Sequence, residues 1–264
     1  MSKTANSSND GSFLSRGDVL SVFLWLGMFI LTLSYSTFGI LIVRPISFFI
    51  DKKLFGMHRI ASWWASSMVT LNPAWRIEVS GREQVLKNKA YVIVANHQSI
   101  ADIAAVLSAL PLHFKFVAKK ELYTIPFLGW HMALAGYMAL DRSSRESGKN
   151  VLLESRSWLR RGVSVLFFPE GTRSLDGAIH AFKIGAFKLA RDQKMEILPV
   201  VIDGTGDCIP KHTWKITKPS VFKVSIGKPV NLSEVSGEHL GPAIDAIREE
   251  MILRLAGLRQ GQSV

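Results

Sequence analysis

The sequence predicts a single α/β domain with a central mixed, largely parallel sheet flanked by helices, preceded by N-terminal membrane-associated helices. Strand-like and helix-like stretches alternate from residue 75 onward, the pattern of an α/β fold. Two of the strand-like stretches, 90–95 and 163–168, are nearly continuous apolar runs, which is typical of strands buried on both faces. Before residue 73 the apolar runs are longer, as membrane helices require.

The N-terminal part divides into a tail and an apolar segment. Residues 1–18 are polar and rich in Ser, Asn and Gly, whereas the 25 residues from 19 to 43 carry no charge. As a helix this segment would span about 37 Å, enough to cross a bilayer. Its softer centre, 32–39, leaves open that it bends and re-enters the membrane instead. A buried core helix is the remaining alternative, although such helices seldom run this long without a charge.

The charges around this segment predict its orientation. Basic residues are more numerous after residue 43 than before residue 19, and the positive flank of a membrane helix stays in the cytoplasm. We therefore expect a protein of the inner or cytoplasmic membrane whose domain, 73–264, faces the cytoplasm. Residues 19–72 form the membrane-associated part. Within it, 54–68 combines Trp63 and Trp64 with Arg59, which suits either the headgroup layer or an amphipathic helix packed on the domain.

Within the domain, the sequence predicts strands and helices that alternate along the chain. Expected strands are 76–79, 90–95, 114–118, 135–140, 163–168, 197–202 and 221–226. Expected helices are 100–110, 121–134 with a break near Pro126, 144–161, 182–191 and 242–255. Ser99 is a suitable N-cap for the helix 100–110, and Gly162 ends the helix 144–161.

Composition narrows the class of partner. The net charge is +11, the hydrophobic fraction is 48% and the mean hydropathy is +0.19. A basic and apolar chain suits anionic membrane lipids, and the aromatic residues are not interleaved with basic ones as in a nucleic-acid platform. Cys208 is the single cysteine, so no intrachain disulfide can form. The histidines have no metal-ligand spacing, and GxSxG, GxGxxG and P-loop motifs do not occur, so we expect no metal and no serine hydrolase.

Two motifs follow apolar strands. In Asn96-His97-Gln98-Ser99-Ile100-Ala101-Asp102, the imidazole and the carboxylate can meet only if the chain turns from strand into helix between them. Such a carboxylate fixes the tautomer of the ring and raises its basicity. Ser99-x-x-Asp102 also resembles a capping box, which is the plainer interpretation of this stretch alone. In Phe168-Pro169-Glu170-Gly171-Thr172-Arg173-Ser174, the glycine permits a tight turn and the guanidinium fits phosphate oxygens, although a capped turn with a salt bridge has the same composition.

Together the motifs resemble the 1-acyl-glycerol-3-phosphate acyltransferase family, whose hallmarks are NHxxxxD and FPEGTRS. The resemblance covers about residues 75–205 and includes intermediate blocks at compatible spacing. These blocks are Lys119-Lys120-Glu121-Leu122, Pro126 with Gly129, Gly136 followed by Arg142, Phe182-Lys183-Ile184-Gly185 and Leu198-Pro199-Val200.

The resemblance implies a membrane O-acyltransferase of phospholipid synthesis. His97 would act as general base, oriented by Asp102, on the sn-2 hydroxyl of lysophosphatidic acid. The acyl donor would be an acyl thioester, either acyl-CoA or acyl-carrier protein, and no cofactor is implied. The phosphate would be bound by Lys119, Arg142 and Arg173. Glu170, Gly171 and Thr172 would hold the glycerol backbone or shape its pocket.

Some roles and functions stay open. Lys183 is a further phosphate candidate, for which a solvated lysine is the favoured interpretation. Backbone N–H groups near Gly171 are one candidate for the oxyanion donors. We interpret Cys208 as a loop cysteine without a catalytic role. Alternative functions are the acylation of another lysolipid or of glycerol 3-phosphate, the hydrolysis of acyl thioesters, and membrane binding without catalysis.

Overall fold

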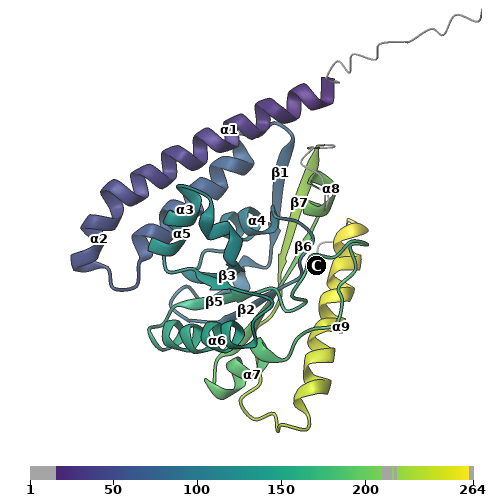
Figure 1. Ribbon diagram of the computed structural model, residues 1–264. Helices are drawn as coiled ribbons and strands as arrows, with labels where there is room; N and C mark the ends of the chain where they lie inside the picture. Colours follow the sequence, from purple (N-terminus) through teal and green to yellow (C-terminus); the bar gives the residue numbers. More distant parts are fainter. Residues whose placement is uncertain (1–15, 210–215, 217–218, 262–264) are drawn as a thin grey trace, which may run out of the picture.

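The computed structural model describes residues 16–209, 216 and 219–261. Most of the polar tail expected at 1–18 therefore lies outside the described residues. Within them, eight strands form one sheet in the order β1-β7-β6-β2-β5-β3-β4, with β8 paired to β6 (Figure 1). The strands are β1 Trp75–Ser80, β2 Val92–Ala95, β3 Phe114–Lys119, β4 Met138–Leu140, β5 Ser164–Phe167, β6 Glu196–Asp203, β7 Ser220–Ile226 and β8 Val230–Asn231.

The sheet is mixed and mostly parallel, as predicted. The neighbours β6, β2, β5, β3 and β4 all run in one direction, whereas β6 pairs antiparallel with both β7 and β8. β1 pairs parallel with β7. Strand ends that carry the two motifs therefore belong to the parallel part of the sheet.

Helices cover both faces of this sheet (Figure 1). They are α1 Arg16–Phe38, α2 Arg44–Ile50, α3 Phe55–Thr70, α4 Asp102–Ala109, α5 Leu128–Leu134, α6 Arg145–Arg160, α7 Gly185–Asp192, α8 Thr205–Cys208 and α9 Leu240–Arg259. Strand β2 shows why its sequence is continuously apolar. Ile93 packs in the cluster with α3, α4 and α5, while Val92 and Val94 pack in the cluster with α6, α7 and α9.

The N-terminal segment is one continuous helical rod. α1 passes through a π-helical turn, Gly39–Val43, into α2, so the chain stays helical across the softer centre and beyond Arg44. Among the described residues this is the one helix long and apolar enough to cross a membrane. One side of the rod packs on α3 and α5, and Gly39 allows this, because a Cβ there would lie 3.0 Å from the His131 ring. Many apolar side chains of the rod are exposed, Phe29, Phe48, Phe49 and Ile50 among them.

The structure decides one open alternative and shortens or divides three expected elements. The segment 54–68 forms α3, which packs on the domain through Met57, Ile60 and Ala65, so the packed alternative holds for that face. The expected helix 121–134 has its break at Pro126, as predicted, and only a 3-10 turn, Lys120–Thr124, precedes the break, with α5 after it. The expected strand 135–140 is reduced to β4, because Gly136 with φ +70° belongs to the turn before it, and the expected helix 182–191 begins only at Gly185.

A cluster of basic side chains is buried between α3, β3 and α5. Burial lowers the pKa of His58, lowers that of His113 to about 3 and that of His131 to about 4. It also lowers the pKa of Lys115 to about 7, and the Nζ of Lys115 donates a hydrogen bond to the Ala135 carbonyl at 2.7 Å. At neutral pH the three histidines are therefore packed as neutral rings, whereas Lys115 is partly protonated.

The histidines of this cluster should make the fold acid-sensitive. An unfolded histidine binds a proton near pH 6.5, whereas folded His131 binds one only near pH 4. The unfolded state thus holds more protons in this window, so the free energy of unfolding should fall as the pH falls from 6.5 to 4, by on the order of 3 kcal/mol for this group. Thermal unfolding between pH 7 and 4 measures the slope. His131→Leu should flatten it, and His239→Leu, at an exposed site, should not; equal slopes in all three proteins would contradict the account.

Candidate active site

The candidate residues lie at one edge of the sheet. His97 follows β2, Glu170 and Arg173 follow β5, Lys119 ends β3, and Arg142 follows β4. These strands are parallel neighbours, so their carboxyl ends meet at the same edge, where open α/β sheets bind ligands. With about 4.8 Å between strands, the outermost of these positions is about 14 Å from His97 across the sheet, which long basic side chains and a phosphorylated substrate can bridge.

His97 and Asp102 are in direct contact. Nδ1 of His97 lies 2.7 Å from Oδ2 of Asp102, and this carboxylate has no exposed surface. The same Oδ2 accepts hydrogen bonds from the backbone N–H groups of Gln98 at 2.7 Å and Ser99 at 3.0 Å. These bonds turn the chain between β2 and α4, as the sequence predicts. The predicted N-cap is wrong, because α4 begins at Asp102 after Ala101; the Ser99 hydroxyl accepts the N–H of Ala101 at 3.3 Å, just before the helix, and donates to the Ile209 carbonyl at 3.1 Å.

The imidazole is held on a second side by Phe168. The two rings are stacked with their centroids 4.2 Å apart and their planes 21° apart. Since a carboxylate only accepts hydrogen bonds, Nδ1 of His97 is the donor, and in the neutral ring this leaves the lone pair on Nε2. About 13% of the His97 side chain is exposed, so a substrate can reach the ring. The geometry therefore suits proton removal from an alcohol.

Glu170 joins two chain segments. Its Oε1 accepts the backbone N–H of His97 at 2.9 Å, and its Oε2 accepts the N–H of His180 at 3.1 Å. The residue is 8% exposed, and burial raises the pKa of its carboxyl group while the two backbone bonds oppose that rise. Both oxygens thus hold the loop after β5 against the base, a role that sequence reasoning did not assign.

Replacing Glu170 should separate positioning from glycerol binding. Glu170→Gln presents an NH₂ group to one of the two backbone donors, so we expect kcat to fall about tenfold with a smaller change in the acceptor KM. Glu238→Gln, the same change at an exposed carboxylate before α9, is the matched control. A raised acceptor KM at unchanged kcat would instead indicate direct contact with the substrate.

Gly171 and Lys183 lie against each other. Gly171 has φ +75°, and a Cβ there would lie 2.6 Å from the Nζ of Lys183, so this lysine passes over the glycine of the motif. The contact brings the Lys183 ammonium beside the candidate site, which favours its phosphate role over that of a remote solvated lysine. The N–H of Gly171 donates to the Phe168 carbonyl at 3.0 Å, so the turn uses this donor and it is not directed at an oxyanion.

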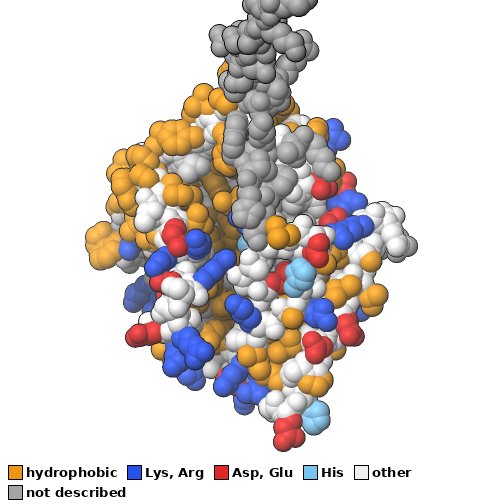
Figure 2. Space-filling model, turned by 45° about the vertical axis from the view of Figure 1, so that its right-hand side comes forward, with side chains coloured by type: hydrophobic (Ala, Val, Ile, Leu, Met, Phe, Trp, Pro, Cys, Tyr) orange, Lys and Arg blue, Asp and Glu red, His pale blue; other side chains and the backbone are white. Residues whose placement is uncertain are grey.

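The remaining cations differ in their surroundings. Arg173 is partly buried, and the next residue, Ser174, donates its N–H to the His97 carbonyl at 2.7 Å. Lys119 is half exposed and its Nζ lies 3.2 Å from Glu121, while Arg142 and Thr172 are exposed. The face of the molecule in Figure 2 has basic side chains scattered over its lower part, below a hydrophobic surface at its upper left.

Sequence reasoning missed the residues that hold the loops together. Asn96 bonds Ile202 with both ends of its amide, at 2.9 and 2.7 Å, and so joins β2 to β6. Arg259, at the end of α9, bonds Asp203 at 3.1 Å and the Gly177 carbonyl at 2.8 Å. A polar residue ending an apolar strand is the signal that could have pointed to Asn96. No local pattern identifies Arg259.

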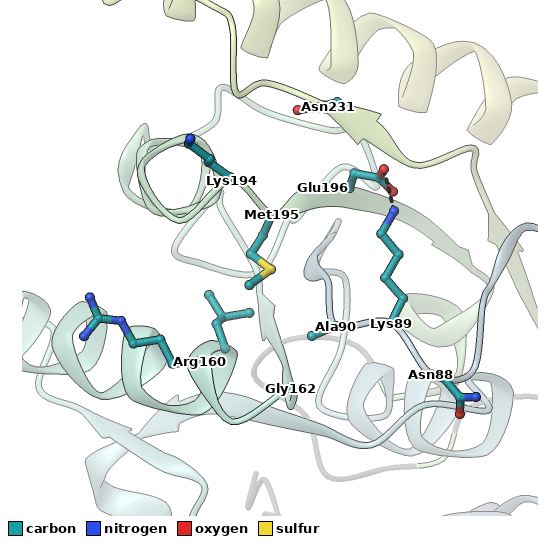
Figure 3. Close-up of a pocket in the computed structure, with 10 residues that line it drawn as sticks. Asn88, Lys89, Ala90, Arg160, Gly162, Lys194, Met195, Glu196 and Asn231 are labelled. Carbon is teal, nitrogen blue, oxygen red and sulfur yellow. Dashed lines mark ion pairs between the residues drawn. The ribbon is translucent and has the colours of Figure 1, made fainter.

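A cavity of about 380 Å³ lies at the opposite edge of the sheet. It is lined by residues next to the starts of β2 and β6, and the ion pair of Lys89 with Glu196, 2.6 Å long, crosses its rim (Figure 3). The Arg160 side chain points away from the cavity in this view. Because none of the motif residues lines this cavity, we do not assign the chemistry to it.

Metal and thiol chemistry find no support in the described part of the chain. It contains no group of three or more His, Cys, Asp or Glu side chains that could hold a metal ion. Burial raises the pKa of the Cys208 thiol to about 12, so the group stays protonated and unreactive at neutral pH.

Comparison with known proteins finds relatives that are similar in sequence over most of the chain. The family model described as Acyltransferase matches residues 76–203. A 1-acyl-sn-glycerol-3-phosphate acyltransferase of Saccharomyces cerevisiae is 33% identical over 207 residues, which are 75% of this chain and 67% of that protein. A chloroplastic enzyme of the same name from Arabidopsis thaliana is 37% identical over 178 residues, 67% of this chain. This chain spans about half the length of the Arabidopsis protein, 49%.

A solved structure matches the fold over nearly its full length. The crystal structure of the 1-acyl-sn-glycerophosphate acyltransferase PlsC from Thermotoga maritima has a TM-score of 0.75 and 28% sequence identity. The match covers 91% of this chain and 98% of that one, so it includes N-terminal helices as well as the α/β domain.

Proposed function

This chain belongs to the 1-acyl-sn-glycerol-3-phosphate acyltransferase family, and we propose that it transfers an acyl group to the sn-2 hydroxyl of 1-acylglycerol 3-phosphate, giving phosphatidic acid. One observation supports this most. His97, whose Nδ1 lies 2.7 Å from Asp102, and the loop that carries Arg173 follow the carboxyl ends of two neighbouring parallel strands and contact each other. A base for a hydroxyl and a cation for a phosphate are the two groups that this acceptor requires.

The proposed reaction needs one base and no covalent intermediate. Nε2 of His97 takes the proton of the acceptor hydroxyl as its oxygen attacks the thioester carbonyl carbon. A C–O bond forms, the C–S bond breaks, and the thiolate takes the proton back from the imidazolium. The products are an ester and a free thiol. The thioester supplies the driving force, so no cofactor is required, and acyl-CoA and acyl-carrier protein both fit this chemistry.

The acceptor phosphate would be bound by the basic side chains near the carboxyl ends of the parallel strands. Arg173 offers a planar fork that matches two phosphate oxygens, and Lys119, Arg142 and Lys183 add point charges or a second fork. Thr172 and Gly171 would lie beside the glycerol. In this arrangement Glu170 supports the loop and does not contact the glycerol itself.

The N-terminal rod would hold the enzyme on its substrate membrane. Its apolar surface is exposed, and Arg59 lies over the rings of Phe55 and Trp63 at 5.7 and 5.2 Å, a pairing suited to the headgroup layer. Basic residues after the rod favour anionic lipids and a cytoplasmic domain.

Selective labelling tests this orientation. Leu253, on α9, is 73% exposed, while the native Cys208 is buried. A Leu253→Cys variant should react with a membrane-impermeant maleimide in inverted vesicles and not in sealed right-side-out vesicles. Wild-type protein is the control for labelling of Cys208. Labelling only in right-side-out vesicles would contradict the orientation.

An acceptor panel tests the function. The full chain in mixed micelles is given one acyl-CoA with lysophosphatidic acid, glycerol 3-phosphate, or a lysolipid whose phosphate is a diester. We expect the highest kcat/KM for lysophosphatidic acid: its phosphomonoester carries more charge for the cations to bind than a diester does, and its acyl chain, which glycerol 3-phosphate lacks, keeps it in the micelle with the apolar rod. A clear preference for another acceptor would refute the assignment of substrate, and a failure to acylate any of them would refute the function.

A further inference from the structure

The second oxygen of Asp102 has a partner outside both motifs. Oδ1 of Asp102 accepts a hydrogen bond from the Thr205 hydroxyl at 2.5 Å, while Oδ2 serves His97 and the turn of the chain. Thr205 and Asp102 both have 0% of their surface exposed. Thr205 also lies beyond residues 76–203, the part that the family model matches.

A tight turn after β6 positions the Thr205 hydroxyl. β6 ends at Asp203, and Gly204 turns the chain with φ +83°, where a Cβ would lie 2.1 Å from the Val221 carbonyl. Thr205 then begins α8, whose N-cap is Gly204 and has no side-chain cap bond. Since the hydroxyl does not cap the helix, its hydrogen bond to Asp102 is the polar interaction that explains a buried threonine here.

We propose that Thr205 is a positioning residue, the third member of a hydrogen-bonded series that runs from Thr205 through Asp102 to His97. This inference rests on the proposed function, since it concerns the base of that reaction. The hydroxyl fixes the rotation of the carboxylate, so that Oδ2 stays aligned with Nδ1 of the ring. Without it, a buried carboxylate oxygen loses its donor and the carboxylate can turn away from the imidazole.

The joint between β2 and β6 explains why this series is rigid. Asn96 bonds Ile202 with both amide atoms, and Gln98 Nε2 lies 3.4 Å from Asp203 Oδ1. The segment before His97 is thereby tied to the segment before Thr205. The Thr205 hydroxyl, which follows β6, can therefore orient the carboxylate of Asp102, 103 residues earlier in the chain.

Replacing Thr205 with an isosteric residue tests the inference. Thr205→Val keeps the shape and removes the hydroxyl, so kcat should fall about tenfold while the KM values of donor and acceptor stay within about twofold. Thr205→Ser keeps the hydroxyl and should retain kcat within about threefold of wild type. If valine is not accommodated, Thr205→Ala is compared with Thr205→Ser in the same way.

A stability control separates positioning from folding. Ser164→Ala removes a buried hydroxyl that accepts the Tyr91 N–H at 3.0 Å, at the far end of β2. It should lower the melting temperature and leave kcat unchanged. The inference is overturned if Thr205→Val keeps wild-type kcat, if Thr205→Ser is as slow as Thr205→Val, or if only KM changes. Activity of the wild-type protein is measured in parallel, so a failure of the proposed function would be seen separately.

Discussion

His97→Ala should lower kcat by about 10²- to 10⁴-fold, the range over which general bases act, and should leave the fold and membrane binding intact. The imidazole is the group that can take the acceptor proton, because its Nδ1 is committed to Asp102 and its Nε2 is left for substrate. Steady-state rates with acyl-CoA and lysophosphatidic acid measure the loss, and circular dichroism and vesicle flotation check the protein.

The matched control for this variant is His239→Ala. His239 is an exposed histidine next to the start of α9, far along the chain from the motif, and its removal should not change kcat. Near-normal turnover of His97→Ala would remove the base from the mechanism and leave a binding protein with an acyltransferase fold.

Arg173→Ala should raise the acceptor KM by about 10- to 100-fold while the donor KM changes little. A charge-assisted bond from a guanidinium to phosphate is among the stronger hydrogen bonds of proteins, which gives this range. Titrating lysophosphatidic acid at fixed acyl-CoA, and then the reverse, separates the two constants.

Two further variants define what the arginine contributes. Arg173→Lys keeps the charge and loses the fork, so it should recover only part of the affinity. Arg160→Ala removes an arginine beside the cavity at the other edge of the sheet and should behave as wild type. An unchanged acceptor KM in Arg173→Ala would contradict the phosphate role.

The parts of the site that are local in sequence could be predicted from it. The turn that brings His97 onto Asp102 follows from a strand, a five-residue separation and a helix, and the structure confirms it. The long apolar rod and the buried strand β2 also follow from their composition, because burial on both faces or in lipid leaves a continuous pattern.

The parts that depend on distant contacts could not be predicted. Glu170 reads as a substrate ligand in its motif, yet its partners are the backbones of His97 and His180, which only the folded sheet brings to it. Thr205 has no signal of its own, since its partner is 103 residues away. The order of strands, with β7 and β1 beyond β6, likewise depends on pairing that no single segment encodes.

Thiol release from acyl-CoA, measured with and without lysophosphatidic acid, tests the central claim most directly. If His97 activates the acceptor hydroxyl for direct transfer, thiol should appear only when the acceptor is present, and in an amount equal to the phosphatidic acid formed. Thiol released at the same rate without acceptor would mean that water takes the place of the alcohol, and the protein would then be a thioester hydrolase.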